Sequence, residues 1–541
     1  MFIKNKNQIA LLGINVLLVF FSIVLSNLHI LPLQFGDFIF FSILTLALTL
    51  YRPGWGFLFF VGTIMLENIN LAPAELGIAI RPFQFFGGLT ILAIIIRLAT
   101  KRLNFKLTRL TWYDWMLILF GLASFASAIF ATNVAVSLKQ SIVLASFIAL
   151  YFLVRNYIQT LDDLKKVIPF FLSSSIVVIG YGIWQNVQFM RGASNFEVMP
   201  GRPNGTFTEA DWLGIFLSLL LALAYSLIFY LYKKRDDFYK DAQISNLKFQ
   251  TSNQFLITKF QILQILMYVF LVVVYVLLIL TVSRSAWLGA LGVTVIFLLS
   301  FFTQLKMDYK KWQWKKTFNL KIKILLAFIA SLALVFLFHL TTFQLGNRAQ
   351  STGSGLQKIT ISCLEKQKLG TQTWNTELLT KSGCRHINLE EIEQEKLAGN
   401  FVTEVYRIDP NVGVRSEIYK KSWDLIKQNP IWGIGWGNIS SHLGTDERGT
   451  GLNASNIFLE IWLGAGIIGL LAFTITWIFI FLKASATLFF ATQEEKALPL
   501  FILLGWFALT IPNLFNSGIL LGFLWLFLGL AFITNQYEST N

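Results

Sequence analysis

Long apolar runs recur along the whole chain, and they constrain the fold more than any other feature. Three clear examples are residues 262–282, 285–302 and 322–340. Each run is close to the roughly 20 residues that an α-helix needs to cross the hydrocarbon core of a bilayer. Strands of a membrane barrel would instead alternate apolar and polar residues over about ten positions, and these runs do not. The runs therefore predict an all-α, polytopic membrane protein.

The number of apolar runs predicts a transmembrane helical bundle of about fourteen spans. Composition agrees, because 13% of the 541 residues are charged, about half the share in a soluble domain. The first run follows Lys4 and Lys6, but it is longer than the apolar part of a usual secretion signal and lacks a clear cleavage site, so we interpret it as a span. The predicted spans lie near residues 9–26, 30–50, 54–70, 82–98, 112–131, 138–153, 167–188, 211–232, 262–282, 285–303, 322–341, 455–482, 497–513 and 518–534.

Basic residues concentrate in a few connections and predict the orientation. If the N-terminus is cytoplasmic, the basic segments 101–109, 233–259 and 306–323 all fall on the cytoplasmic side, as the positive-inside rule requires. Both termini are then cytoplasmic, and the one long connection is extracytoplasmic. The net charge of +15 comes largely from these segments, which would face anionic membrane lipids. We therefore predict no nucleic-acid site.

The chain divides into three parts. Residues 1–341 form a membrane body of about eleven spans, residues 342–454 an extracytoplasmic loop, and residues 455–541 the last three spans. Within the loop, residues 346–399 are polar and resemble a variable insertion. Residues 414–428 carry apolar side chains at helical spacing, which predicts an amphipathic helix on the outer membrane surface.

The chain has two cysteines, Cys363 and Cys384, and both lie in the long loop. A disulfide between them is compatible with an oxidising compartment and would be unusual in the cytosol. Two unrelated free thiols are the alternative, because spacing alone does not establish pairing.

Several arginines are predicted on the outer side, against the usual charge bias, and three stand out by their context: Arg202, Arg284 and Arg415. A guanidinium group presents a planar, permanently charged fork that suits diphosphate oxygens. The alternative for each arginine is a snorkelling residue that anchors a helix at the membrane interface. Arg284 is the hardest to explain in that way, because Ser283 and Ser285 flank it in a very short hairpin between two spans.

The segment from Leu280 to Gly289, with Arg284 at its centre, resembles the central signature of the O-antigen ligase and polymerase family. The resemblance extends over roughly residues 200–480. The other residues that carry it are Arg415, Tyr419, Asn429-Pro430, Gly433-Ile434-Gly435, Asn456-Ile457-Phe458-Leu459-Glu460, Gly464, Gly466, Gly469 and the stretch from Arg202 to Gly214.

This resemblance implies a bacterial inner-membrane enzyme whose fold resembles the polyprenol-dependent membrane glycosyltransferases. Its donor would be a polyprenyl-diphosphate-linked glycan, with an undecaprenyl carrier, and its acceptor a glycan or a lipid core. By resemblance, Arg202, Arg284 and Arg415 hold the diphosphate. The residues predicted to bind substrate are Arg202, Asn204, Ser283, Ser285, Ser455 and Asn456, with Arg284 and Arg415 acting in catalysis.

One departure concerns the catalytic base. The ligases carry a histidine just before the Asn-x-aromatic-Leu motif, where this chain has Ser455. This favours a polymerase or an unassigned transferase over a ligase. Candidate bases are His442, Glu209 and Glu460. His442 lies in a stretch, 440–451, with no helical pattern to hold it.

We find no spacing of His, Cys or acidic residues typical of a metal site, and no nucleotide-binding fingerprint. We therefore expect no cofactor and a metal-independent, inverting transfer. The alternatives are a transporter of a small anion such as inorganic carbon, a polysaccharide export component, or a non-catalytic scaffold. A transporter should carry ionisable groups or broken helices near the bilayer midplane, whereas the three arginines gather at one rim.

Overall fold

The structure is a computed structural model of the whole chain. Most of the predicted insertion 346–399, the start of the basic segment 306–323 and part of the basic segment 233–259 lie outside the described residues. The described residues are 6–103, 105–193, 201–244, 251–303, 314–341, 345, 356–364, 379, 381–387, 392–408, 410–445, 451–490 and 496–533.

Helices account for most of the described chain, as the apolar runs predict. The helices of the first 341 residues are α1 (Lys6–Asn27), α2 (Phe35–Tyr51), α3 (Pro53–Thr63), α4 (Pro82–Ala99), α5 (Trp112–Ile129), α6 (Val134–Tyr157), α7 (Leu161–Met190), α8 (Ala210–Ile244), α9 (Thr251–Leu280), α10 (Arg284–Thr303) and α11 (Trp314–Leu337). Later helices are α14 (Ile392–Leu397), α15 (Pro410–Gln428), α16 (Ile439–Leu443), α17 (Ile457–Phe490), α18 (Ala497–Asn513) and α19 (Gly522–Ala531).

Ten of the described helices are long and apolar enough to cross a membrane, which confirms a multi-pass membrane protein. The other four predicted spans correspond to shorter helices: α2 with 17 residues, α3 with 11, α18 with 17 and α19 with 10. The prediction of about fourteen full spans is thus confirmed only in part. All residues of α19 are buried. A helix enclosed by protein need not match the bilayer thickness, because its neighbours cover it.

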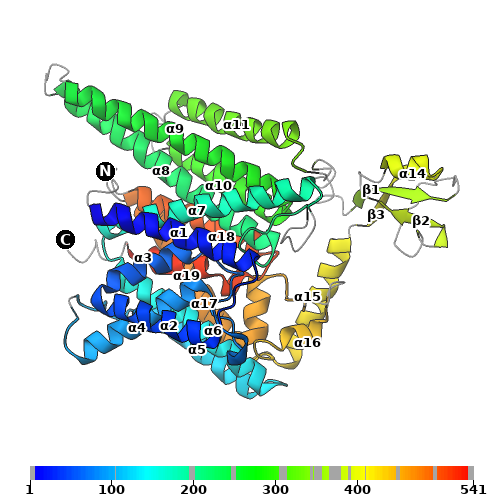
Figure 1. Cartoon of the computed structure of the whole chain (residues 1–541), viewed down its shortest axis with the longest axis horizontal. Helices are drawn as coiled ribbons and strands as arrows, with labels where there is room; N and C mark the ends of the chain where they lie inside the picture. Colours follow the sequence, from blue (N-terminus) through cyan, green and yellow to red (C-terminus); the bar gives the residue numbers. More distant parts are fainter. Residues whose placement is uncertain are drawn as a thin grey trace.

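The two ends of the bundle differ. Both termini lie on the left of Figure 1, whereas α15, α16 and a small sheet lie on its right. Because consecutive helices alternate in direction, the connections 64–81, 130–133, 201–209, 281–283 and 514–521 reach the same end as α15 and α16. We call this end the loop end.

A three-stranded antiparallel sheet lies in the long loop, so the all-α prediction is wrong for this segment. Its strands are β1 (Leu356–Cys363), β2 (Cys384–His386) and β3 (Phe401–Ile408), in the order β2-β1-β3. Cys363 pairs with Cys384 in the β1–β2 register, and the structure joins them in a disulfide. Ile359 and Ile361 are buried on the same face as Cys363, the two-residue period of a strand. That pattern is short and easily overlooked in a polar stretch.

The helix α17 is broken at Gly466, where the backbone has φ 66° and ψ −174°. The loop 430–437 packs into the break. The backbone N–H of Ile467 donates to the carbonyls of Pro430 and Ile431, both at 3.2 Å. A Cβ on Gly466 would lie 1.9 Å from the carbonyl oxygen of Ile431. Glycine is therefore required here by both the positive φ and the close approach.

Candidate functional site

The segment 201–209 at the loop end is held by two other parts of the chain. The Gln185 side chain of α7 accepts a hydrogen bond from the N–H of Gly205 at 2.8 Å. The Thr206 hydroxyl donates to the carbonyl of Met65 at 2.6 Å. Asn204 is buried and donates to the carbonyl of Phe207 at 2.6 Å. These bonds fix the segment that carries the predicted Arg202 and Asn204.

A buried ion pair that the sequence analysis missed supports the same segment. The Arg81 guanidinium contacts one Glu67 carboxylate oxygen at 2.7 Å. The other oxygen of Glu67 accepts hydrogen bonds from the hydroxyl of Thr208 at 2.7 Å and its N–H at 3.1 Å. Glu67 is 2% exposed. The sequence could have indicated this ion pair, because Glu67 lies near the end of a predicted span and an ionisable group in a span usually has a partner.

Arg202 connects the segment 201–209 to the turn between α9 and α10. Its Nε donates to the carbonyl of Thr281 at 2.9 Å, and its Nη2 lies 3.3 Å from the Asp211 carboxylate. The residue is 6% exposed. Arg202 is therefore a buried group with protein partners, and Asp211 is a second residue that the sequence analysis missed.

The turn 281–283 presents Arg284 at the start of α10. Val282 has φ +51° and is fully buried. A left-handed conformation in a β-branched residue is strained, at a cost of about 1–3 kcal/mol. The surrounding contacts hold it in place, and α10 begins immediately afterwards. Arg284 is partly exposed, while the flanking Ser283 and Ser285 are buried with their hydroxyl oxygens 3.3 Å apart.

The turn also contacts the connection after α18. The Asn516 side-chain amide donates to the Ser285 hydroxyl at 2.9 Å and to the Pro512 carbonyl at 3.0 Å. The carbonyl of Leu514 accepts from the Asn456 side-chain amide at 3.1 Å and from the Tyr419 hydroxyl at 3.4 Å.

Arg415 approaches the same connection from α15. Its guanidinium carbon lies 5.8 Å from the centre of the Phe515 ring, a cation–π arrangement. The three consecutive residues Leu514, Phe515 and Asn516, which we call the 514–516 loop, thus contact Asn456, Tyr419, Arg415 and Ser285. The structure brings these predicted residues together, and Arg202 joins them through Thr281. The sequence analysis missed the 514–516 loop itself.

Tyr419 is a hydrogen-bond donor in this arrangement. Burial raises the pKa of its phenol, and the nearby Arg415 guanidinium opposes the shift. The protonated hydroxyl donates to the carbonyls of Ser455 at 3.2 Å and Leu514. Tyr419 therefore ties α15 to the start of α17.

Ser455, Asn456 and Glu460 form the beginning of α17. Asn456 Oδ1 accepts from the N–H groups of Phe458 at 2.9 Å and Leu459 at 3.2 Å, which is the geometry of a helix N-cap. Glu460 reaches back to accept from the N–H of Ala454 at 2.6 Å. Ser455, with φ +49°, lies between these groups. The Glu460 carboxylate thus has a structural role at the helix start.

His442 contacts a different part of the loop end. It lies in the short helix α16, so the expectation that no helix holds it is wrong for residues 440–443. Its Nε2 is 3.4 Å from the Thr132 hydroxyl in the α5–α6 turn. Asn438 and Asn133 fasten the same contact, with the N–H of Asn133 donating to Asn438 Oδ1 at 3.1 Å. Glu209, the remaining candidate, directly precedes α8 and is partly exposed.

Within the described residues, no group of three or more His, Cys, Asp or Glu side chains is placed to hold a metal ion. The polar side chains described in contact with the 514–516 loop carry guanidinium, amide and hydroxyl groups. Such groups donate hydrogen bonds and bind anions.

The fold defines a multi-pass helical membrane protein, and the polar cluster at the loop end defines its candidate site. Residues 268–474 match the family model described as O-Antigen ligase. This part of the membrane protein is therefore similar to the O-antigen ligase family, which confirms the resemblance. The match includes Arg284, Arg415, His442, Ser455 and Glu460, whereas Arg202, Asn204 and Glu209 precede it. No curated protein and no solved structure matches the chain.

Proposed function

We propose that the chain transfers or polymerises a polyprenyl-diphosphate-linked oligosaccharide at the loop end, on the extracytoplasmic face of the bacterial inner membrane. The observation that carries the proposal is the convergence of Ser285, Arg415 and Asn456 on the 514–516 loop, with Arg284 directly before Ser285 in the chain. The family match covers these residues.

Arg284 and Arg415 would bind the diphosphate oxygens. Both are partly exposed at the loop end, and a guanidinium group suits bidentate contact with phosphate. As the bond between the anomeric carbon and the diphosphate oxygen breaks, negative charge develops on the leaving diphosphate. Fixed cations stabilise that charge in the transition state more than in the bound donor.

Arg202 would act differently from the other two arginines. Because it is buried against Thr281 and Asp211, we assign it to positioning the turn 281–283 that presents Arg284. Asn204, Ser283 and Ser285 would support the same turn and the bound diphosphate. This role explains why an arginine outside the matched segment belongs to the site.

The acceptor hydroxyl would attack the anomeric carbon on the face opposite the diphosphate, so the configuration is inverted. Its proton passes to a base or to solvent as the new glycosidic bond forms. Glu209 is the candidate base nearest in sequence to the segment that carries Arg202. Glu460 is engaged by Ala454, and the described contact of His442 is with Thr132.

The principal alternative is an anion transporter, and the break in α17 is the feature that would favour it. That break is filled by the loop 430–437, whose Ile434 and Trp436 are buried. The buried ion pair Arg155–Asp114 is a second feature that a transporter could use. It joins the last turn of α6 to the first turn of α5 and therefore lies near the helix ends. Neither feature provides a charged path at the bilayer midplane. Export and scaffold roles would leave the arginines without a common target.

Glycan analysis of a deletion strain tests the proposal. We expect loss of either long glycan chains or glycan-capped lipid core, with the undecaprenyl-linked donor accumulating. Restoration by the natural chain but not by Arg284→Ala connects the defect to the site. An unchanged glycan profile, with changed uptake of a small anion instead, would contradict the transferase assignment. Loss of capping indicates a ligase, and loss of chain length a polymerase.

A further inference from the structure

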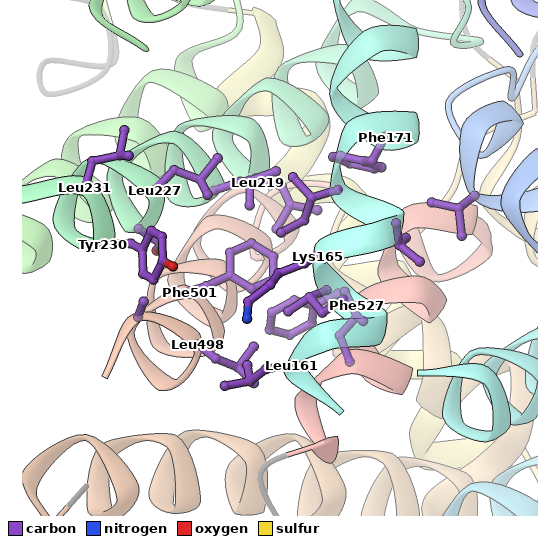
Figure 2. A pocket seen from close by; sticks show the side chains of 18 of the residues that line it. Leu161, Lys165, Phe171, Leu219, Leu227, Tyr230, Leu231, Leu498, Phe501 and Phe527 are labelled. Atoms are coloured by element: carbon purple, nitrogen blue, oxygen red, sulfur yellow. The ribbon is translucent and has the colours of Figure 1, made fainter. Parts of the chain in front are cut away.

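An apolar groove lies away from the loop end, between α7, α8, α18 and α19 (Figure 2). Its deep part is lined by Phe171, Leu219 and Phe523, and its outer part by Leu161, Leu498 and Leu530. The outer part lies toward the helix ends opposite the loop end, because α7 begins there and α8 ends there. We call this outer part, where Lys165 and Lys234 are among the lining residues, the mouth of the groove.

The groove is long enough for the hydrocarbon chain of a lipid. Its lining on α8 runs from Leu219 to Lys234, about 22 Å of helix at roughly 1.5 Å per residue. One leaflet of a bilayer contributes roughly 15 Å of hydrocarbon, half of the usual core.

The charged residues that line the groove are both lysines, Lys165 and Lys234. Figure 2 shows the Lys165 ammonium group directed among Tyr230, Phe501 and Phe527. Lys234 Nζ donates to the Tyr230 hydroxyl at 3.3 Å, so phenol and ammonium groups meet at the mouth. Lys165 also pairs with Asp162 at 2.7 Å.

Of the described residues that line the groove, none is acidic. The nearby carboxylates of Asp162 and Asp163 pair with Lys165 and Lys166 of the same helix. An apolar groove with a cationic rim is complementary to a lipid with an anionic headgroup.

We propose that this groove binds one acyl chain of an anionic phospholipid, with the phosphate at Lys165, Lys234 and Tyr230. The polyprenyl donor is a poor candidate for this groove, because its diphosphate would lie at the loop end, at the far side of the bundle. The bound lipid fills the space between α7–α8 and α18–α19. Binding of this lipid would stabilise the packing of α18 and α19, the two helices that the 514–516 loop connects. That packing would then depend on the content of anionic lipid in the membrane.

Lipid binding by the purified full-length protein tests this. Phosphatidylglycerol and phosphatidylcholine are titrated separately, and bound lipid is counted by native mass spectrometry. We expect phosphatidylglycerol to bind at least about 10-fold more tightly, with the preference falling as salt rises. The double variant Lys165→Ala/Lys234→Ala should lose the preference.

Lys166→Ala is the matched control. Lys166 is the next residue on α7, pairs with Asp163 at 3.1 Å, and does not line the groove. We expect it to keep the preference for phosphatidylglycerol. Equal binding of the two lipids by the natural chain, an unchanged preference in the double variant, or an equal loss in Lys166→Ala would each overturn the proposal.

Photo-crosslinking locates the lipid in the unaltered protein, so the test does not depend on folding of a variant. Phosphatidylglycerol carries a diazirine at the end of one acyl chain, and labelled peptides are identified by mass spectrometry. We expect labels within 219–227 or 523–530. Labels confined to the exposed faces of α1 and α11 would refute lipid binding in the groove. Equal labelling of the groove by the phosphatidylcholine analogue would refute the preference for an anionic headgroup.

Discussion

At the scale of single residues, the candidate site depends on what each arginine contacts. Arg202 is buried and bonded to Thr281 and Asp211. Arg284 and Arg415 are partly exposed; Arg415 lies over Phe515, and Arg284 directly precedes Ser285, which contacts Asn516. A buried arginine with protein partners holds structure, whereas an exposed guanidinium group can bind a ligand. The same residue type therefore has two roles in one site.

Replacing Arg284 with lysine separates charge from geometry. We expect Arg284→Lys to lower transfer activity by at least about 10-fold although the charge is kept, because an ammonium group cannot make the bidentate contact. The measurement is turnover of a lipid-linked donor by purified protein, with expression and thermal unfolding compared as controls. Full turnover by a normally folded variant would show that Arg284 only anchors the membrane edge.

His442 tests whether this chain uses a histidine base. Since His442 contacts Thr132 and Ser455 occupies the position where the resemblance implies a histidine, we expect His442→Ala to keep activity within about 3-fold. General base catalysis typically contributes at least about 10²-fold, so the two outcomes are well separated. The decisive contrary result is a pH–rate limb near about 6.5, the ordinary histidine pKa, that disappears in His442→Ala.

At the scale of secondary-structure elements, the break in α17 determines how the loop 430–437 packs. Gly433, Gly435 and Gly466 all have positive φ. A Cβ on Gly433 would lie 2.4 Å from the carbonyl oxygen of Leu463. Ile434 N–H donates to that same carbonyl at 2.7 Å. The glycines thus permit a backbone-to-backbone contact that positions α15, and Arg415 with it, beside the start of α17.

Gly466→Ala should destabilise the protein. The added Cβ would collide with the Ile431 carbonyl, and alanine would have to adopt the positive φ that Gly466 has here. We therefore expect the free energy of unfolding to fall by at least about 2 kcal/mol, with a lower unfolding temperature. Gly180→Ala is the matched control, because Gly180 lies within α7 with open space at its Cβ position. Equal unfolding temperatures for Gly466→Ala and the natural chain would contradict the proposed role of the break.

At the scale of the whole molecule, the separation of the two ends supports a defined orientation. The termini lie opposite the sheet, α15 and α16 in Figure 1. The basic residues around the proposed lipid groove lie at the terminal end. If that end is cytoplasmic, as the positive-inside rule predicts, the disulfide and the candidate site are both extracytoplasmic.

Thiol labelling of intact cells tests this orientation. Cys363 and Cys384 are the only cysteines and are joined in the structure. We therefore expect no labelling by a membrane-impermeant maleimide until an impermeant reductant is added, and strong labelling afterwards. As a control, a cysteine introduced in the basic segment 101–109 should react only after the membrane is opened. Rapid labelling of the natural cysteines from the cytosol would show that the long loop is cytoplasmic, and it would contradict the proposed extracytoplasmic site.

Helix positions, the basic connections and the arginine motifs are evident in the sequence because hydrophobicity, charge and short motifs are local properties. Even so, α3 and α19 are much shorter than their apolar runs suggested. Helix ends depend on burial by neighbours as well as on composition. The sheet was missed because its alternating residues occupy only short strands.

By itself, the sequence determined that this protein is a multi-pass helical membrane protein with a segment similar to the O-antigen ligase family. Only the tertiary structure decided which residues form the candidate site. Asn516 meets Ser285 across 231 positions, and Thr208 meets Glu67 across 141. Such contacts depend on how the helices pack and where their connections meet, and no local pattern of residues encodes that.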